Sequence, residues 1–79
     1  MLLRKAFGIA VSSERKLRNL TQAQLAELSN VHLSALSNLE RGARPASFDT
    51  METISLALGV PLSTLFRRAE ELQQSNPGL

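Results

Sequence analysis

The sequence contains no cysteine and only one histidine, His32. Without cysteine the chain can form neither a disulfide nor a thiolate metal site, and one imidazole without further strong ligands is not a metal site. Nucleophilic or acid–base catalysis needs a nucleophile or carboxylate beside a base in a pocket, and the sequence offers no such arrangement. We therefore expect no catalytic residue, no metal and no cofactor.

Long apolar runs are also missing. No segment approaches the roughly 20 apolar residues of a membrane span. The opening MLLRK lacks the apolar core and small-residue cleavage site of a signal peptide. We therefore expect a cytoplasmic protein with no membrane association. The 79 residues make one small domain, which buries only about 60% of its unfolded surface, so oligomerisation would help to stabilise it.

The chain has little excess of either sign of charge, since its formal net charge is only +2. Its distribution is uneven. Residues 1–45 hold seven Lys and Arg against three Asp and Glu, whereas residues 46–79 hold two against four. A positive half suits the phosphates of a nucleic acid, although a difference of this size also arises by chance.

Apolar residues recur at helical spacing along the chain, and no segment alternates as a half-buried strand does. We expect an all-α, compact five-helix bundle. Its helices are predicted at about 3–18, between Thr21 and a turn at 29–31, at about 32–41, at about 48–58, and from 61 or 62 onward. Residues 1–72 would form the domain, and residues 73–79, with Ser, Asn, Pro and Gly, a flexible tail.

The inner side and the ends of these helices can be assigned from residue type. Asn19 is expected in a left-handed conformation just after the first helix, Thr21 and Ser47 as N-caps, and Gly59 as the end of the fourth helix. The predicted inward residues of the first two helices are Leu3, Phe7, Ala10 or Val11, Leu17, Leu25, Ala26 and Leu28.

The segment TQAQLAELSNVHLSALSNLERG, residues 21–42, predicts a short helix, a tight turn and a second short helix. In the second helix Leu36 and Leu39 face inward at i and i+3. The outward face then consists of Leu33, Ser34, Ser37, Asn38 and Arg41. A helix face of short polar side chains that ends in arginine suits insertion into a DNA major groove.

This segment resembles the helix-turn-helix of the XRE family, which includes the phage lambda and 434 repressors and Cro. The resemblance covers roughly residues 7–66. The matching residues are Leu20-Thr21-Gln22, Leu25-Ala26, Val31, Leu36, Leu39-Glu40-Arg41-Gly42, Pro45-Ala46-Ser47 and Ala57-Leu58-Gly59-Val60-Pro61-Leu62. It implies the lambda-repressor-like bundle with its helix-turn-helix at helices 2 and 3.

The resemblance also implies roles for individual residues. Arg15 and Glu40 would form a structural ion pair between helix 1 and the recognition helix. Gln22, at a helix start that attracts phosphate, would contact the DNA backbone. Arg41 and Arg44 would lie along the same backbone. Thr21 and His32 are further candidates for phosphate contact, and a plain exposed turn residue is at least as good a reading of His32.

Leu33, Ser34, Ser37 and Asn38 are the predicted base-contacting residues. Asparagine can bond adenine N6 and N7, serine hydroxyls suit several bases, and leucine can touch a thymine methyl group. The face holds no Gln or Lys, which leaves the operator sequence open and gives weight to readout of DNA shape.

An apolar stripe in the last helix, formed by Phe66, Ala69 and Leu72, is the predicted dimer interface. A two-fold dimer would set two recognition helices about 34 Å apart on an inverted repeat. The resulting hypothesis is a homodimeric regulator of transcription that binds double-stranded DNA, with repression as its favoured action. The alternatives are a restriction-modification controller protein and an antitoxin-type protein-interaction module.

Overall fold

The computed structural model describes residues 1–76 of the chain. It contains five helices: α1 (Leu3–Leu17), α2 (Gln22–Ser29), α3 (Leu33–Arg41), α4 (Phe48–Leu58) and α5 (Leu62–Ser75). Residues 1–76 contain no strand. The predicted all-α, five-helix architecture is therefore confirmed, and the helix-turn-helix is formed by α2 and α3.

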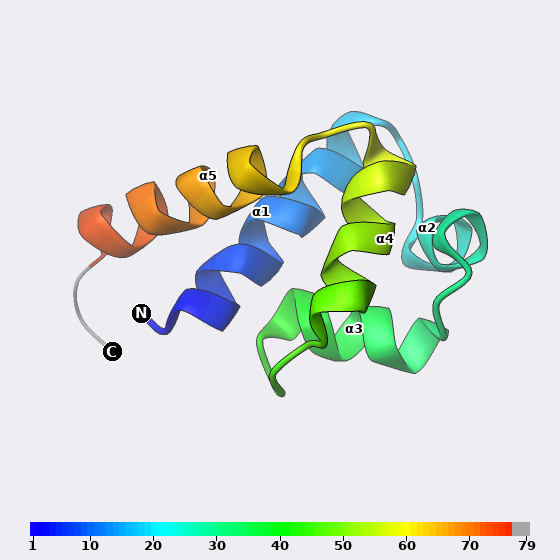
Figure 1. The fold of residues 1–79 in the computed structure, drawn as a ribbon, viewed down its shortest axis with the longest axis horizontal. Coiled ribbons are helices and arrows are strands. Elements are labelled where there is room, and N and C mark those ends of the chain that lie inside the picture. The colour runs from blue at the N-terminus through cyan, green and yellow to red at the C-terminus, as the bar shows by residue number, and fades with distance from the viewer. Residues whose placement is uncertain (77–79) are drawn as a thin grey trace.

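The bundle is built around α1. This helix packs along α5 on one side and against α3 on the other, while α2 packs against α3 and α4. In Figure 1, α1 and α5 lie side by side and α3 lies along the lower edge of the molecule. The side chains that fill the centre come from all five helices, and the largest fully buried ones are Val11, Leu25, Leu36, Ile54 and Leu65.

The helix ends follow the sequence closely. Thr21 Oγ1 accepts from the Gln24 backbone N–H over 3.1 Å, and the Gln24 side chain accepts from the Thr21 N–H over 2.8 Å, which is a complete capping box. Ser47 caps α4 through the Thr50 N–H. Asn19 and Asn30 both adopt the left-handed conformation, with φ of 56°. These predicted ends are confirmed.

Gly8 of α1 lies against the backbone at the end of α3. A Cβ atom at Gly8 would lie 2.4 Å from the Leu39 carbonyl oxygen and 2.5 Å from that of Glu40. Both atoms are backbone, so neither can rotate away. Glycine lowers helix stability by about 1 kcal/mol relative to alanine, but here it allows the end of α3 to rest directly on α1.

Three leucines predicted to face inward do not. Leu3 is 37% exposed, Leu17 is 75% exposed and Leu28 is 63% exposed. In the last turns of α1 the inward positions belong to Glu14 and Arg15, and α2 turns Leu25, Ala26 and Ser29 inward. Helical spacing identifies residues that could be buried. Which of these residues are buried depends on where the neighbouring helices pack.

Helix α5 runs past Leu72, the last residue of the predicted domain, and ends at Ser75. Gln73 is tied to the opposite end of the chain, where its Nε2 donates to the Met1 carbonyl over 3.0 Å. This tertiary hydrogen bond holds the last turn of α5, which has few apolar side chains, against the N-terminal residue. The rest of the predicted tail, residues 77–79, lies outside the described residues.

Candidate nucleic-acid interface

The outward face of α3 carries the residues predicted to contact bases. Leu33 and Ser34 are exposed and Ser37 and Asn38 are half-buried. The inward face holds Leu36, Leu39 and Glu40. No acidic side chain interrupts the outward face, because the only carboxylate of α3 points into the protein. The face is thus open to a polyanion.

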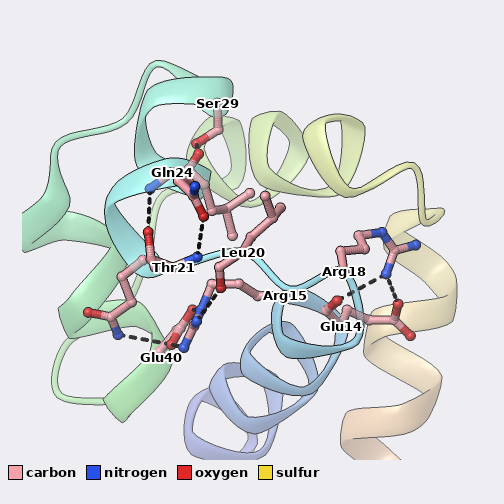
Figure 2. A network of polar contacts seen from close by, with 10 residues as sticks. Glu14, Arg15, Arg18, Leu20, Thr21, Gln24, Ser29 and Glu40 are labelled. Carbon is pink, nitrogen blue, oxygen red and sulfur yellow. Dashed lines mark hydrogen bonds and ion pairs between the residues drawn. The ribbon is translucent and has the colours of Figure 1, made fainter.

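The Arg15–Glu40 pair holds α3 to α1. Arg15 Nε donates to Glu40 Oε2 over 2.8 Å and Nη2 donates to Oε1 over 3.0 Å. The predicted contact is therefore present, and both residues are buried. Arg15 Nη1 also donates to the Leu20 carbonyl over 2.7 Å, so the guanidinium joins α1, the chain leading into α2, and α3 (Figure 2).

Gln22 enters the same network, which the sequence did not reveal. Its Nε2 donates to Glu40 Oε1 over 2.9 Å. An amide nitrogen carries two hydrogens, so one holds Gln22 against Glu40 and the other remains available to an acceptor such as a phosphate oxygen. The predicted phosphate contact of Gln22 is compatible with this geometry. Glu40 thereby positions a side chain at the start of α2 as well as α3 itself.

The end of α3 is fixed by a second glycine. Gly42 ends the helix with φ of 65°, a left-handed conformation that favours glycine. A Cβ atom there would lie 2.6 Å from the Lys5 Cα. Arg4 Nε adds a hydrogen bond of 3.1 Å to the Gly42 carbonyl. The loop that follows α3 is therefore seated on the first turn of α1.

Two arginines predicted to contact phosphates differ in their surroundings. Arg41 Nη2 donates to Asn38 Oδ1 over 2.6 Å, so Asn38 and Arg41 are joined on the outward face. Arg44 is exposed, and within residues 1–76 it makes no hydrogen bond or ion pair. The Arg44 guanidinium keeps all its donors for a ligand.

His32 and Thr21 stand at the starts of the two helices. His32 is the N-cap residue of α3, is exposed, and makes no side-chain capping bond. Thr21 is exposed, and its oxygen is engaged in the capping box. Its hydroxyl hydrogen is not needed for that box, so both residues keep a group that can meet phosphate.

Glu14 is a buried carboxylate that sequence reasoning overlooked. It is 4% exposed and forms ion pairs with Arg18, one turn along α1, and with Arg68 of α5. Arg18 Nη1 also donates to the Glu14 carbonyl over 3.0 Å. The i, i+4 spacing of Glu14 and Arg18 was the available signal. Through Arg68 the cluster links α1 to α5. In Figure 2, Glu14 and Arg18 lie apart from the Glu40 network.

The predicted dimer interface on α5 is wrong for Ala69, which is 0% exposed and belongs to the core. Phe66 and Leu72 pack against the same core, and the Phe66 ring lies 4.8 Å from that of Phe7, centroid to centroid. The stripe covers α1 of its own chain, because α1 carries a matching apolar side. It leaves little surface for a partner.

No helix within residues 1–76 is both long enough and apolar enough to cross a bilayer. The same residues contain no group of three or more His, Cys, Asp or Glu side chains placed to hold a metal ion.

A family model described as helix-turn-helix matches residues 11–65, the segment whose geometry is given above. The chain belongs to the XRE family of helix-turn-helix proteins. The family match includes both helices of the helix-turn-helix, α2 and α3, together with the Arg15–Glu40 pair and the start of α5.

The similar proteins include a phage repressor, a control protein and a solved regulator structure. The immunity repressor protein of Bacillus phage phi105 is 40% identical over 58 residues, which cover 73% of this chain and 40% of the relative. Control protein C.BamHI of Bacillus amyloliquefaciens is 41% identical over 59 residues, 73% of each protein. Among solved structures, the clp gene regulator ClgR of Corynebacterium glutamicum superposes with a TM-score of 0.84 at 35% identity, covering 90% of this chain and 92% of that one.

The match is partial in length for some relatives. An uncharacterised helix-turn-helix transcriptional regulator of Mycobacterium tuberculosis is 38% identical over 86% of this chain, but over only 49% of its own length. The chain thus spans half or less of the phage repressor and of the mycobacterial regulator.

Proposed function

We propose that this protein is a sequence-specific DNA-binding regulator of transcription that acts as a homodimer, most simply as a repressor by occupying its operator. The observation that carries the proposal is the outward face of α3, which is free of carboxylates while Glu40 is turned inward onto Arg15. Ser34, Ser37 and Asn38 would read base edges in the major groove, with Leu33 against a thymine methyl group.

Phosphate contacts would surround this face. Gln22 offers its second amide hydrogen, and Arg44 offers a guanidinium with no partner in residues 1–76. Arg41, Thr21 and His32 complete the proposed set. Such contacts position the protein but carry no sequence information. Because each neutralised phosphate releases counterions, we expect affinity to fall steeply with salt.

For the homodimer we propose a different face from the one the sequence suggested. Leu56 is 74% exposed on α4. Beside it, a cleft of about 410 Å³ is lined partly by Glu52, Val60, Pro61 and Leu62. In a two-fold dimer the same patch of both subunits forms the interface. The exposed Leu56 side chain of each subunit would then insert into the neighbouring cleft of the other subunit.

A second candidate function is control of a restriction-modification operon. It is favoured by the similarity to control protein C.BamHI and by the superposition on the restriction-modification controller protein C.AhdI of Aeromonas hydrophila, with a TM-score of 0.76 at 29% identity over 78% of this chain and 94% of that one. A reporter placed behind the selected operator distinguishes the two. A repressor lowers transcription at every protein concentration, whereas a controller that activates raises it over part of the range.

Selection of duplexes from a random pool, at moderate salt and with the full chain, tests the proposal. We expect enrichment of an inverted repeat whose half-sites lie about one helical turn, roughly 34 Å, apart. Asn38→Ala serves as the matched variant, and its enriched sequences should be less defined at one position of each half-site. Binding without any enriched sequence would contradict base reading, and an enriched single half-site would contradict the dimer.

A further inference from the structure

A cavity of about 180 Å³ lies beneath the loop that follows α3. Its walls come from the first turns of α1, the end of α3, the 44–46 loop segment, α4 and α5, and it is open to solvent on one side. The apolar lining is formed mainly by Leu3, Phe7, Leu39, Pro45, Met51 and Phe66. The cavity is therefore bounded by the protein core on one side and by the proposed DNA-contacting loop on the other.

The charged residues of the lining are all of one sign. Arg4 and Arg44 line the cavity, and no carboxylate does. Arg44 makes no hydrogen bond or ion pair within residues 1–76, and Arg4 uses only Nε, toward the Gly42 carbonyl. An apolar cavity whose charged lining residues are both arginines complements a ligand with an apolar body and an anionic head. Arginine suits a carboxylate in particular, because its planar fork can donate two parallel hydrogen bonds.

The size and walls of the cavity define the apolar body. An apolar protein cavity of about 150 Å³ holds one benzene molecule, so about 180 Å³ accepts a single ring with a short substituent. Phe7 and Phe66 form a tilted pair on one side, and the Met51 thioether adds a polarisable group that packs well on aromatic edges. From these features we infer that the protein binds a small monoaromatic carboxylate in this cavity.

A ligand in the cavity would contact α3 and the loop that follows it. Leu39 belongs to α3, and Arg44 is among the residues proposed to contact phosphate. A carboxylate held by Arg4 and Arg44 neutralises charge at the loop and competes with the DNA backbone for the same donors. The ligand should lower DNA affinity without needing a separate sensor domain. This consequence rests on the proposed function, whereas the binding itself does not.

The test is a titration of the uniformly ¹⁵N-labelled full chain with phenylacetate, followed through amide chemical shifts. We expect shifts at Phe7, Ala46 and Met51 that saturate below about 10 mM ligand. 2-Phenylethanol has the same ring and chain length with a neutral head, and it should bind at least fivefold more weakly. Shifts that stay linear with phenylacetate through about 10 mM, or equal affinity for the alcohol, would overturn the inference.

Variants locate the site. Ala46→Leu adds volume to the lining and should abolish saturable binding, provided the amide spectrum remains that of a folded chain. Arg4→Gln removes one cation and should weaken phenylacetate at least fivefold. Arg67 is an exposed arginine of α5 that does not line the cavity. Arg67→Gln removes the same charge at a distance from the site and should leave the affinity for phenylacetate unchanged. Equal weakening by both arginine variants would reduce the effect to net charge and reject the site.

DNA titrations then separate the two proposals. With the selected operator, saturating phenylacetate should raise the Kd at least threefold and lower the slope of log K against log salt by about 1, as expected for one lost phosphate contact. Localised ligand binding with unchanged operator affinity would reject the regulatory consequence alone. Failure to bind any duplex would reject the proposed function and leave the cavity assignment standing on the amide shifts.

Discussion

Gln22 and Glu40 lie 18 residues apart in sequence and are joined by a hydrogen bond of 2.9 Å between Gln22 Nε2 and Glu40 Oε1. The same oxygen accepts from Arg15 Nη2 over 3.0 Å. One carboxylate thus fixes both the first residue of α2 and the last turn of α3 relative to α1. The helix-turn-helix is held together by this polar contact as well as by its apolar core.

Replacement of Glu40 should therefore cost stability. In Glu40→Ala the buried Arg15 guanidinium loses its only ion-pair partner within residues 1–76, and we expect the free energy of unfolding to fall by about 3 kcal/mol. Urea denaturation measures this loss. Glu70→Ala, at an exposed position on α5, is the control and should change stability by no more than about 0.5 kcal/mol. Equal stabilities of the two variants would contradict the structural role of the pair.

Gly8→Ala should destabilise the protein although alanine is the better helix former. The helix propensity favours alanine by about 1 kcal/mol, but the new methyl group would overlap the carbonyl oxygens of Leu39 and Glu40. Forced shifts of a packed backbone typically cost about 1–3 kcal/mol, so we expect a net loss in thermal or urea unfolding. Ser13→Ala, exposed on the same helix, should be neutral or slightly stabilising. A more stable Gly8→Ala would show that α3 can move away freely.

Asn38 and Arg41 should have separable effects on DNA binding. Asn38→Ala should cost about 1–3 kcal/mol on the preferred site and relax discrimination at one base pair, whereas Arg41→Ala should weaken binding to all duplexes and lower the salt slope by about 1. Fluorescence anisotropy with specific and random duplexes measures both. Equal loss on random DNA would remove Asn38 from the base-contacting set.

The contact between these two side chains makes a further point testable. Asn38 Oδ1 accepts from Arg41, and bidentate pairing with adenine would use the second lone pair of the same oxygen. The two residues should therefore be coupled in a double-mutant cycle on the preferred site and uncoupled on random DNA. Strict additivity on the preferred site would indicate that Asn38 contacts DNA only through its amide nitrogen.

Leu56→Glu should yield a folded monomer with weak operator binding. A charge on the proposed self-complementary face opposes its own symmetry mate, and a monomer contacts one half-site only. Sedimentation velocity and circular dichroism measure association and folding. Leu17→Glu is closely matched, because Leu17 is 75% exposed and Leu56 74%, and it should leave association unchanged. Ala69→Glu should instead unfold the chain, since Ala69 has no exposed surface. A Leu56→Glu protein that stays dimeric would move the interface elsewhere.

Sequence reasoning succeeded where structure depends on near neighbours in the chain. Thr21, Ser47, Asn19 and Gly59 were assigned correctly because caps and left-handed turns are decided within about four residues. The Arg15–Glu40 contact followed from the family resemblance. The predicted base and phosphate contacts remain predictions, because they concern DNA.

The errors arose where distant segments meet. Leu17 and Leu28 carry the right spacing for burial, but no helix covers them. Ala69 seemed available to a partner because the matching apolar side of α1, including Phe7, could not be assigned to α5 from sequence. The sequence also does not show why α1 contains Gly8, because the approach of the α3 backbone to that residue is a tertiary contact. Burial depends on which elements become neighbours, and periodicity does not contain that information.

The seating of Gly42 on Lys5 has a practical consequence for any fusion protein. A purification peptide or fluorescent protein attached ahead of Met1 would emerge from the same end of α1 that supports the 42–46 loop, with Arg4 already bonded to that loop. Added histidines or acidic residues would alter the electrostatic field of the proposed DNA surface. Affinities and salt slopes should therefore be measured on the chain freed of such an attachment, or with the attachment moved to another exposed surface.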